Sequence, residues 1–97
     1  MEILVGDDFE LTDAIKEEVH QRIEQVESHL PKKGDARVHL QMSGGIFHVQ
    51  FHYSFSKANV VASAEDRDFH RALNEAKQKL QRQLDDFVKK RRKRRSA

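Results

Sequence analysis

The sequence contains no cysteine, so the chain forms no disulfide bond and offers no thiolate to a metal ion. This composition fits a reducing compartment. Long apolar runs are missing as well, since the longest one near the N-terminus is Ile3-Leu4-Val5 and no basic segment precedes it. Such a run is too short for a signal peptide or a membrane span. We therefore expect a cytoplasmic protein that has no membrane partner.

Catalytic motifs are also missing. The chain has no G-x-S-x-G, P-loop or H-E-x-x-H pattern, and it has no cysteine nucleophile. Its many carboxylates are spread along the outward faces of predicted helices, where water keeps them ordinary acids. We therefore expect no enzyme, no cofactor and no small-molecule substrate.

Three histidines, His39, His48 and His52, fall on the outward face of a predicted sheet. His48 and His52 are four residues apart on one strand, about 13 Å along it, so they cannot share a metal ion. His39 can approach one of them across a hairpin, but one pair does not complete a metal site. We expect no metal, and regard these histidines as exposed, hydrogen-bonding or base-stacking residues.

Charge is abundant and unevenly distributed along the chain. Asp, Glu, Lys and Arg make up 35% of the sequence, and the formal net charge is +2. Lys89 to Arg95 are seven consecutive cations, whereas residues 1–88 hold 11 Lys and Arg against 16 Asp and Glu, a net charge of −5. We predict one folded domain over residues 1–88 and a basic tail over residues 89–97, frayed or disordered by its own repulsion. Such a tail suits a polyanionic partner.

A short strand and a helix are predicted for the first third of the chain. Residues 2–5 are prone to form a strand, which Gly6 stops. Thr12 offers an N-cap for a helix that Pro31 ends. Apolar residues recur between them at spacings of three and four, which is typical of an amphipathic helix. This apolar face consists of Ile15, Val19, Ile23, Val26 and Leu30.

Three strands are predicted next. Residues 36–42 and 46–55 alternate in polarity, and Ser43–Gly45 between them indicate a hairpin turn. A strand over residues 60–64 follows, in which Ala62 and Ala64 leave room for a helix to pack closely. The inward residues of the longest strand are Phe47, Val49, Phe51, Tyr53 and Phe55.

A long second helix completes the domain, and either Asp66 or Asp68 can cap it. Its apolar face consists of Phe69, Ala72, Leu73, Ala76, Leu80, Leu84 and Phe87. The order predicts an α+β fold of the type β-α-β-β-β-α, a four-stranded sheet with both helices packed on one face. The first strand, which is joined through a helix, should pair in parallel.

The outward face of the second helix carries cations. At 100° per residue, Arg82 and Lys89 lie within about 20° of Arg71, Lys93 lies near 40° and Lys79 lies near 80°. Such a face can follow a phosphate backbone. Equally, outward helix residues are usually charged and merely solvated, and Glu75 and Asp86 interrupt this face. The pattern alone leaves both readings open.

The segment Val60–Leu84, "VVASAEDRDFHRALNEAKQKLQRQL", resembles the signature of the ribosome hibernation-promoting factor family. This family includes the ribosome-associated inhibitor protein Y, and its members are also called sigma-54 modulation proteins. The matching positions are Ala62, Ala64, Asp68, Phe69, Ala72, Leu73, Lys79, Leu80, Arg82, Gln83 and Leu84. The first helix is similar as well, with Thr12, Ala14, Val19 and Arg22 in place. His70 and Asn74 depart from the family's usual tyrosine and aspartate, and Asp85 and Asp86 precede the basic residues.

The resemblance implies a fold similar to double-stranded-RNA-binding domains. It also implies binding to the small ribosomal subunit, where the protein would contact 16S rRNA in the mRNA and tRNA channel at the A and P sites. The chain is similar to short members of the family, and we expect a monomer off the ribosome. The expected rRNA-binding residues are Arg22, Arg71, Lys79, Arg82, Lys89, Lys90, Arg91, Arg92 and Lys93.

Two other functions fit the same sequence. The first is a protein-interaction module that binds a transcription or stress-response factor through the exposed face of the sheet. Its contact residues would be Arg37, His39, Gln41, His48 and His52. The second is a general binder of double-stranded RNA.

Overall fold

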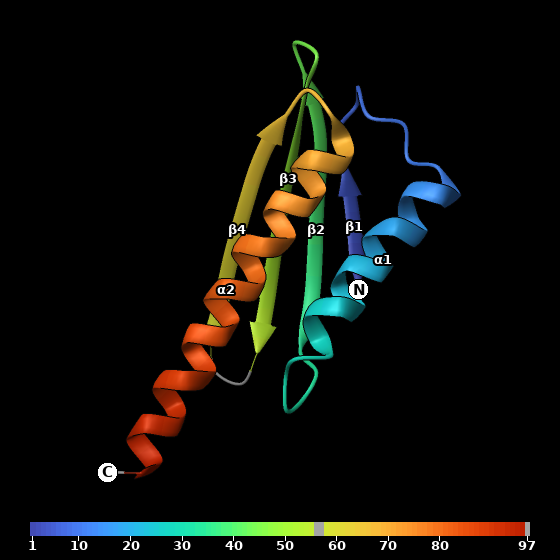
Figure 1. The fold of residues 1–97 in the computed structure, drawn as a ribbon. Helices are drawn as coiled ribbons and strands as arrows, with labels where there is room; N and C mark the ends of the chain where they lie inside the picture. Colours follow the sequence, from blue (N-terminus) through green and yellow to red (C-terminus); the bar gives the residue numbers. More distant parts are fainter. Residues whose placement is uncertain (56–57, 97) are drawn as a thin grey trace.

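The protein folds into one four-stranded sheet with two helices on one of its faces (Figure 1). The structure is a computed structural model that describes residues 1–55 and 58–96, with side chains described as far as Lys89. The elements are β1 (Glu2–Val5), α1 (Asp13–Glu27), β2 (Asp35–Ser43), β3 (Ile46–Phe55), β4 (Ala58–Asp66) and α2 (Phe69–Ser96). The strands lie in the order β1-β2-β3-β4. β1 pairs with β2 in parallel, and the other two pairs are antiparallel.

Helix α1 begins where the sequence places its cap. Thr12 has an extended backbone, and its side-chain oxygen accepts a hydrogen bond of 3.2 Å from the backbone N–H of Ile15. This bond satisfies one of the unpaired N–H groups of the first turn. Val19, Ile23 and Val26 are buried against the sheet. The predicted end of this helix is wrong by one turn, because the helix ends at Glu27 and Ser28, not Pro31, forms its C-cap.

The β2–β3 hairpin turns through two glycines. Gly44 and Gly45 have φ angles of 57° and 76°, which side-chain-bearing residues rarely adopt, and Ser43 pairs with Ile46 directly beside them. A two-residue turn of this kind fixes the register of the strands. Val49, Phe51, Tyr53 and Phe55 are therefore all buried on the helix-covered face.

Helix α2 lies along β4 and β3, and small residues set its distance from the sheet. Asp68 caps it, since a carboxylate oxygen accepts a 2.9 Å hydrogen bond from the backbone N–H of His70. The buried residues facing one another across this contact are Ala62 and Ala64 on β4 and Ala72, Leu73, Ala76, Leu80 and Leu84 on α2. Alanines on both sides let the helix approach closely, while the leucines fill the remaining space.

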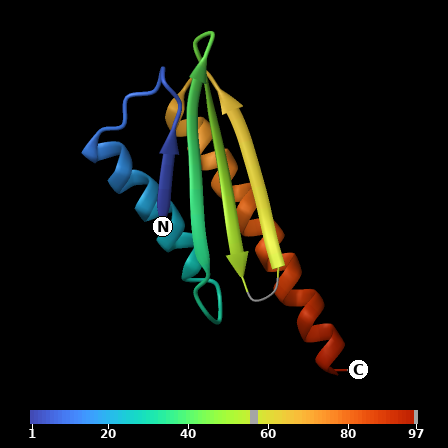
Figure 2. The ribbon, with the colours of Figure 1, turned by 180° about the vertical axis from the view of Figure 1, so that it is seen from behind.

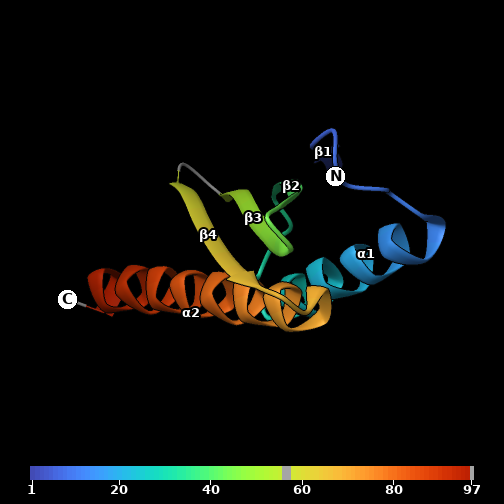
Figure 3. The same ribbon diagram turned by 90° about the horizontal axis from the view of Figure 1, so that it is seen from above.

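The two faces of the sheet differ in cover. Seen from above, α1 and α2 lie on the same side of the strands (Figure 3). Seen from behind, the other face lies in front of both helices and no described element covers it (Figure 2). An antiparallel sheet tolerates this arrangement when its outward residues are polar. The predicted fold class, including the parallel first strand, is confirmed.

The end of α2 continues beyond the sheet. Its 28 residues span about 42 Å at 1.5 Å per residue, whereas the nine residues of β4 span about 30 Å. The last turns therefore project past the strands (Figure 1). The boundary predicted at residue 88 lies inside this helix, whose backbone is helical to Ser96. That the tail frays in solution stays a prediction. In the described part of the chain, no helix is both long enough and apolar enough to cross a membrane.

The buried hydroxyl of Tyr53 connects three parts of the fold. It donates a 2.8 Å hydrogen bond to a carboxylate oxygen of Glu27 and accepts one of 2.9 Å from the backbone N–H of Gly34. Gly34 is required here, because a Cβ at this position would lie 2.0 Å from the carbonyl oxygen of Ser54. Burial, together with the Glu27 carboxylate, raises the pKa of Tyr53 to about 12. The hydroxyl thus ties the end of α1 and the loop after it to β3.

We predict that Tyr53→Phe lowers the free energy of unfolding at pH 7 by about 1–2 kcal/mol, because it leaves two partners of the hydroxyl unpaired. Denaturation with urea measures the change. The hydroxyl binds its proton more tightly in the folded chain, where its pKa is about 12 against an ordinary value of 10.0. The advantage over Phe should therefore be complete below pH 10, fall by at most roughly 1.4 kcal/mol per pH unit above it, and be lost before pH 12.

Tyr53 is the single tyrosine of the chain, so an ultraviolet titration reads its pKa directly. A pKa near 10 in the folded protein, or a difference between the two proteins that is independent of pH, would contradict this account.

Candidate nucleic-acid interface

Three cations form one row along the outward face of α2, which we call the cation row. It consists of Arg71, Arg82 and Lys89, all of which are exposed. They lie within about 20° of one another around the helix and span about 27 Å along its axis. Within the part of the chain that the structure describes, none of them makes an ion pair or a side-chain hydrogen bond. Their N–H groups are therefore free to bind an anionic ligand.

Acidic residues interrupt the cation row. Glu75 lies four residues before Lys79, and its carboxylate is 3.7 Å from the Lys79 ammonium. Between Arg82 and Lys89 along the helix, Asp85 lies about 40° to one side of the row. Asp86 lies about 60° to the other side. A ligand that follows the row therefore meets separate points of positive charge.

Lys79 has a second role, at the edge of the sheet. Its ammonium donates a 3.0 Å hydrogen bond to the backbone carbonyl of Ser63, and the Gln83 carboxamide donates one of 3.0 Å to that of Val61. β4 is an edge strand, so alternate carbonyls point away from its one neighbour. Lys79 and Gln83 are four residues apart on the helix, a distance of about 6 Å along its axis. Ser63 and Val61 are two residues apart on the strand, about 6.6 Å, so each side chain lies opposite its own carbonyl.

The segment from Lys79 to Leu84 thus divides its residues between three tasks. Lys79 and Gln83 cover the edge of β4, and Leu80 and Leu84 are buried in the core. Arg82 remains on the outward face. Of the cations predicted within this segment, Arg82 is the one whose charge is wholly available, since Lys79 also contacts Glu75 and Ser63.

Arg22 lies between the two helices. Its Nε donates a 2.7 Å hydrogen bond to the side-chain oxygen of Asn74 on α2. Nearby, Nδ1 of His70 lies 3.1 Å from a carboxylate oxygen of Glu18. Asn74 and His70 are the two positions at which the chain departs from the family signature, and both now connect α1 to α2. The remaining N–H groups of the half-buried Arg22 guanidinium can still contact a ligand.

The uncovered sheet face collects the other predicted contact residues. Arg37, His39, Gln41, His48 and His52 all lie there, as the alternation predicts. The rings of His39 and His52 are 5.3 Å apart between centroids, and Nδ1 of His48 lies 3.2 Å from a carboxylate oxygen of Glu65. Nowhere in residues 1–55 and 58–89 do three or more His, Asp or Glu side chains gather in a group that could hold a metal ion.

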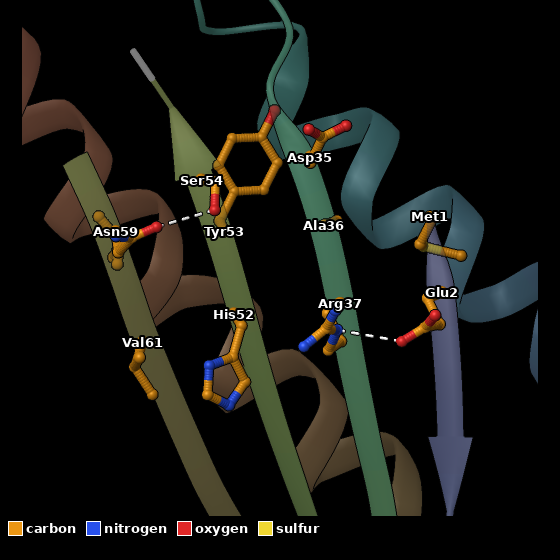
Figure 4. Close-up of a pocket in the computed structure, with 11 residues that line it drawn as sticks. Met1, Glu2, Asp35, Ala36, Arg37, His52, Tyr53, Ser54, Asn59 and Val61 are labelled. Atoms are coloured by element: carbon orange, nitrogen blue, oxygen red, sulfur yellow. Dashed lines mark hydrogen bonds and ion pairs between the residues drawn. The ribbon is translucent and has the colours of Figure 1, made fainter. Parts of the chain in front are cut away.

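One end of this face is hollowed. Arg37, His52 and Val61 lie side by side on β2, β3 and β4 (Figure 4). Arg37 pairs with Glu2 on β1 at 3.0 Å, and the Ser54 hydroxyl donates a 2.8 Å hydrogen bond to the side chain of Asn59 (Figure 4). The hollow measures about 580 Å³, and two pairs of its polar side chains, Arg37 with Glu2 and Ser54 with Asn59, already bind each other.

Four of the predicted contact residues cannot be placed. The side chains of Lys90, Arg91, Arg92 and Lys93 lie outside the described residues, although the helical backbone continues through them. Their role in binding stays a prediction.

The sequence did not reveal several partners in these surfaces. Nothing in the spacing indicates that Asn74 meets Arg22 or that Glu65 meets His48, because both pairs join different elements. Phe9 was also missed as a core residue, since it lies in the irregular segment before α1, where no periodicity marks it. The edge contacts of Lys79 and Gln83 were detectable in principle. The two residues are four apart on a helix, so they point in the same direction and can both contact a neighbouring edge strand.

One family model matches most of the chain, and solved structures share its fold. Residues 3–92 match the family described as "Sigma 54 modulation protein / S30EA ribosomal protein". The N-terminal domain of protein Y from Thermus thermophilus superposes with a TM-score of 0.81 at 25% identity, over 88% of this chain and 94% of that one. A ribosomal subunit interface protein from Coxiella burnetii has the same fold, with a TM-score of 0.77 at 16% identity, over 91% of this chain and 98% of that one. No curated protein matches the chain in sequence.

We predict that Gln83→Ala lowers the free energy of unfolding by about 0.5–1 kcal/mol, because it exposes the Val61 carbonyl on the edge of β4. Gln78→Ala is the matched control, since Gln78 is exposed on the same helix and makes no described side-chain hydrogen bond. It should be neutral or slightly stabilising through helix propensity. Urea denaturation of both variants measures the difference, and equal effects would show that the edge contact is not stabilising.

Proposed function

The chain belongs to the sigma 54 modulation protein / S30EA ribosomal protein family, whose members are ribosome-associated modulation factors, and from this we propose that it is a hibernation factor that inhibits translation. It binds the small ribosomal subunit and contacts 16S rRNA in the channel that mRNA and tRNA use at the A and P sites. This proposal places the protein in the cytoplasm. The observation that carries it is the cation row of Arg71, Arg82 and Lys89 on α2, which makes no ion pair with any side chain that the structure describes.

The cation row suits contact with a phosphate backbone. Guanidinium groups bind phosphate oxygens through two parallel hydrogen bonds, and Lys adds a point charge. These contacts carry no base specificity, so the shape of the channel has to supply the selectivity. Arg71, Arg82 and Lys89 are the proposed primary contacts. Arg22 and Lys79 contribute secondarily, because each is also engaged within the fold.

Inhibition follows from occupancy. No catalytic step is part of the proposal, because a folded domain in the channel excludes mRNA and tRNA by volume alone. The projecting end of α2 extends the positive charge beyond the body of the domain. The tail cations, Lys89 to Lys93 among them, add affinity and association rate, which are long-range electrostatic effects.

One observation favours a second function, that of a protein-interaction module. The five residues predicted for it, Arg37, His39, Gln41, His48 and His52, share the uncovered sheet face. This face points away from both helices (Figure 2). Pull-down from nuclease-treated lysate separates the two functions, because association through rRNA is lost there and association through a protein is kept.

We predict that Arg82→Glu weakens binding to purified small subunits by at least about tenfold, because it removes one phosphate contact and adds a repulsive charge. Co-sedimentation at near-physiological salt measures the affinity. The matched control is Lys16→Glu, which makes the same charge change at an exposed position on α1 that has no described ion pair. Both variants should keep the parent Tm, since neither residue packs in the core. Equal loss in the two variants would mean that net charge alone drives binding.

Deletion of residues 89–97 should reduce the salt dependence of the same binding. Each neutralised phosphate contributes about −0.7 to −0.9 to the slope of log affinity against log salt. If all seven tail cations contact rRNA, the slope should flatten by roughly 5 to 6. A slope that does not change on deletion would place the tail outside the interface. Competition with mRNA and tRNA in a footprint on the small subunit then tests the steric mechanism.

A further inference from the structure

A groove opens where the start of α1, the segment before it and the start of α2 meet the end of β2 and the start of β3. Its volume is about 680 Å³. The apolar lining residues are Phe9, Ala14, Ile15, Met42, Phe47 and Phe69. The polar ones are Asp8, Glu10, Glu18 and His70. None of these residues belongs to the cation row or to the uncovered sheet face.

The floor of the groove is a triangle of three phenylalanine rings. The ring centroids of Phe9 lie 6.1 Å from Phe47 and 5.7 Å from Phe69, and those of Phe47 and Phe69 are 5.7 Å apart. Edge-to-face and tilted contacts of this kind hold the rings in place. Phe9 is 8% exposed, while Phe47 and Phe69 are only partly buried and leave apolar surface open to the groove. This floor can therefore receive an apolar side chain without first rearranging.

The rim of the groove is acidic on two sides. Asp8 and Glu10 come from the segment before α1 and flank Phe9 in the sequence, while Glu18 comes from α1 itself. Glu18 contacts His70, but Asp8 and Glu10 have no ion pair among the described side chains. Among the residues whose side chains the structure describes, no Lys or Arg lines the groove. Its charge is thus opposite to that of the cation row.

We propose that this groove, the acidic–aromatic groove, binds a basic protein segment in which Lys or Arg residues flank one large apolar side chain. The apolar side chain would lie on the phenylalanine floor, where it is removed from water. The flanking cations would meet the carboxylates of Asp8, Glu10 and Glu18 at the rim. Burial of one anchor in a pocket, surrounded by charged contacts at the edge, is the usual anatomy of a peptide site.

Charge complementarity selects this partner over others. An RNA backbone would meet three carboxylates at the rim, so phosphates are repelled from the groove. The basic tail of a second copy, Lys89 to Arg95, has the right charge but contains no apolar residue. The apolar residues just before it, Phe87 and Val88, pack against the core of their own domain. The partner is therefore a basic segment of a different protein.

A short peptide tests the inference on the whole chain without ribosomes, so that its outcome is independent of the proposed function. The probe is the acetylated and amidated peptide Lys-Lys-Phe-Lys-Lys, titrated into the labelled protein and followed by NMR. We expect saturable shifts of the backbone amides of Phe9, Ile15 and Met42. Two control peptides should each bind at least about tenfold more weakly. Lys-Lys-Gly-Lys-Lys lacks the apolar side chain, and Glu-Glu-Phe-Glu-Glu lacks the flanking cations.

Paired variants locate the site. Asp8→Lys together with Glu10→Lys should weaken the binding of Lys-Lys-Phe-Lys-Lys by at least about tenfold, because the rim becomes repulsive. The control is Glu17→Lys together with Glu24→Lys, the same charge change at exposed positions of α1 that do not line the groove. It should bind the peptide as the parent does.

Four outcomes would overturn the proposal. They are equal losses in the two double variants, equal binding of the glycine peptide, shifts confined to α2 and the tail, and an absence of saturable shifts in the parent chain. The last three are read on the parent chain itself, so they decide the matter even if a double variant fails to fold.

Discussion

The structure depends on the close approach of α2 to the sheet, which four buried alanines permit. Ala62 and Ala64 on β4 and Ala72 and Ala76 on α2 are all buried in the core, and α2 contacts β4, so small side chains contribute to this contact. At this distance the side chains of Lys79 and Gln83 reach the carbonyls at the edge of β4. The orientation that these contacts fix turns Arg71, Arg82 and Lys89 outward. Larger residues in place of the alanines would move the helix away and would loosen the edge cover and the cation row together.

The molecule separates its charges by face. Cations project from α2, while the segment before α1 and the start of α1 carry the carboxylates that surround the acidic–aromatic groove. Residues 1–88 can therefore have a net charge of −5 and still present local positive charge on α2, at Arg71 and Arg82. The field close to each face, rather than the sum over the chain, decides which partner approaches there.

The sequence predicted most of the fold because its signals are periodic and local. Thr12, the glycine pair of the hairpin and the alternation of residues 46–55 each determine a nearby element. The position of Phe9 and the contacts of Arg22 with Asn74 could not be predicted in the same way, because they join segments that only the tertiary fold brings together. The bond of Lys79 to Ser63 also joins two elements, and the sequence indicated it only through the spacing of four between Lys79 and Gln83 beside an edge strand. Of the candidate site, the outward positions were predictable, but not which of their charges remain available.

The uncovered face of the sheet has a thermodynamic consequence. The cation row and the residues around His39 and His52 point away from each other and share no contact among the described side chains. Two ligands that bind on these opposite sides use different residues and do not compete for the same surface. Occupation of α2 by a polyanion would therefore leave the sheet residues accessible. The protein, bound to a surface through α2, would then act as a tether for a second ligand on its sheet. The effective concentration of that ligand near the surface would rise.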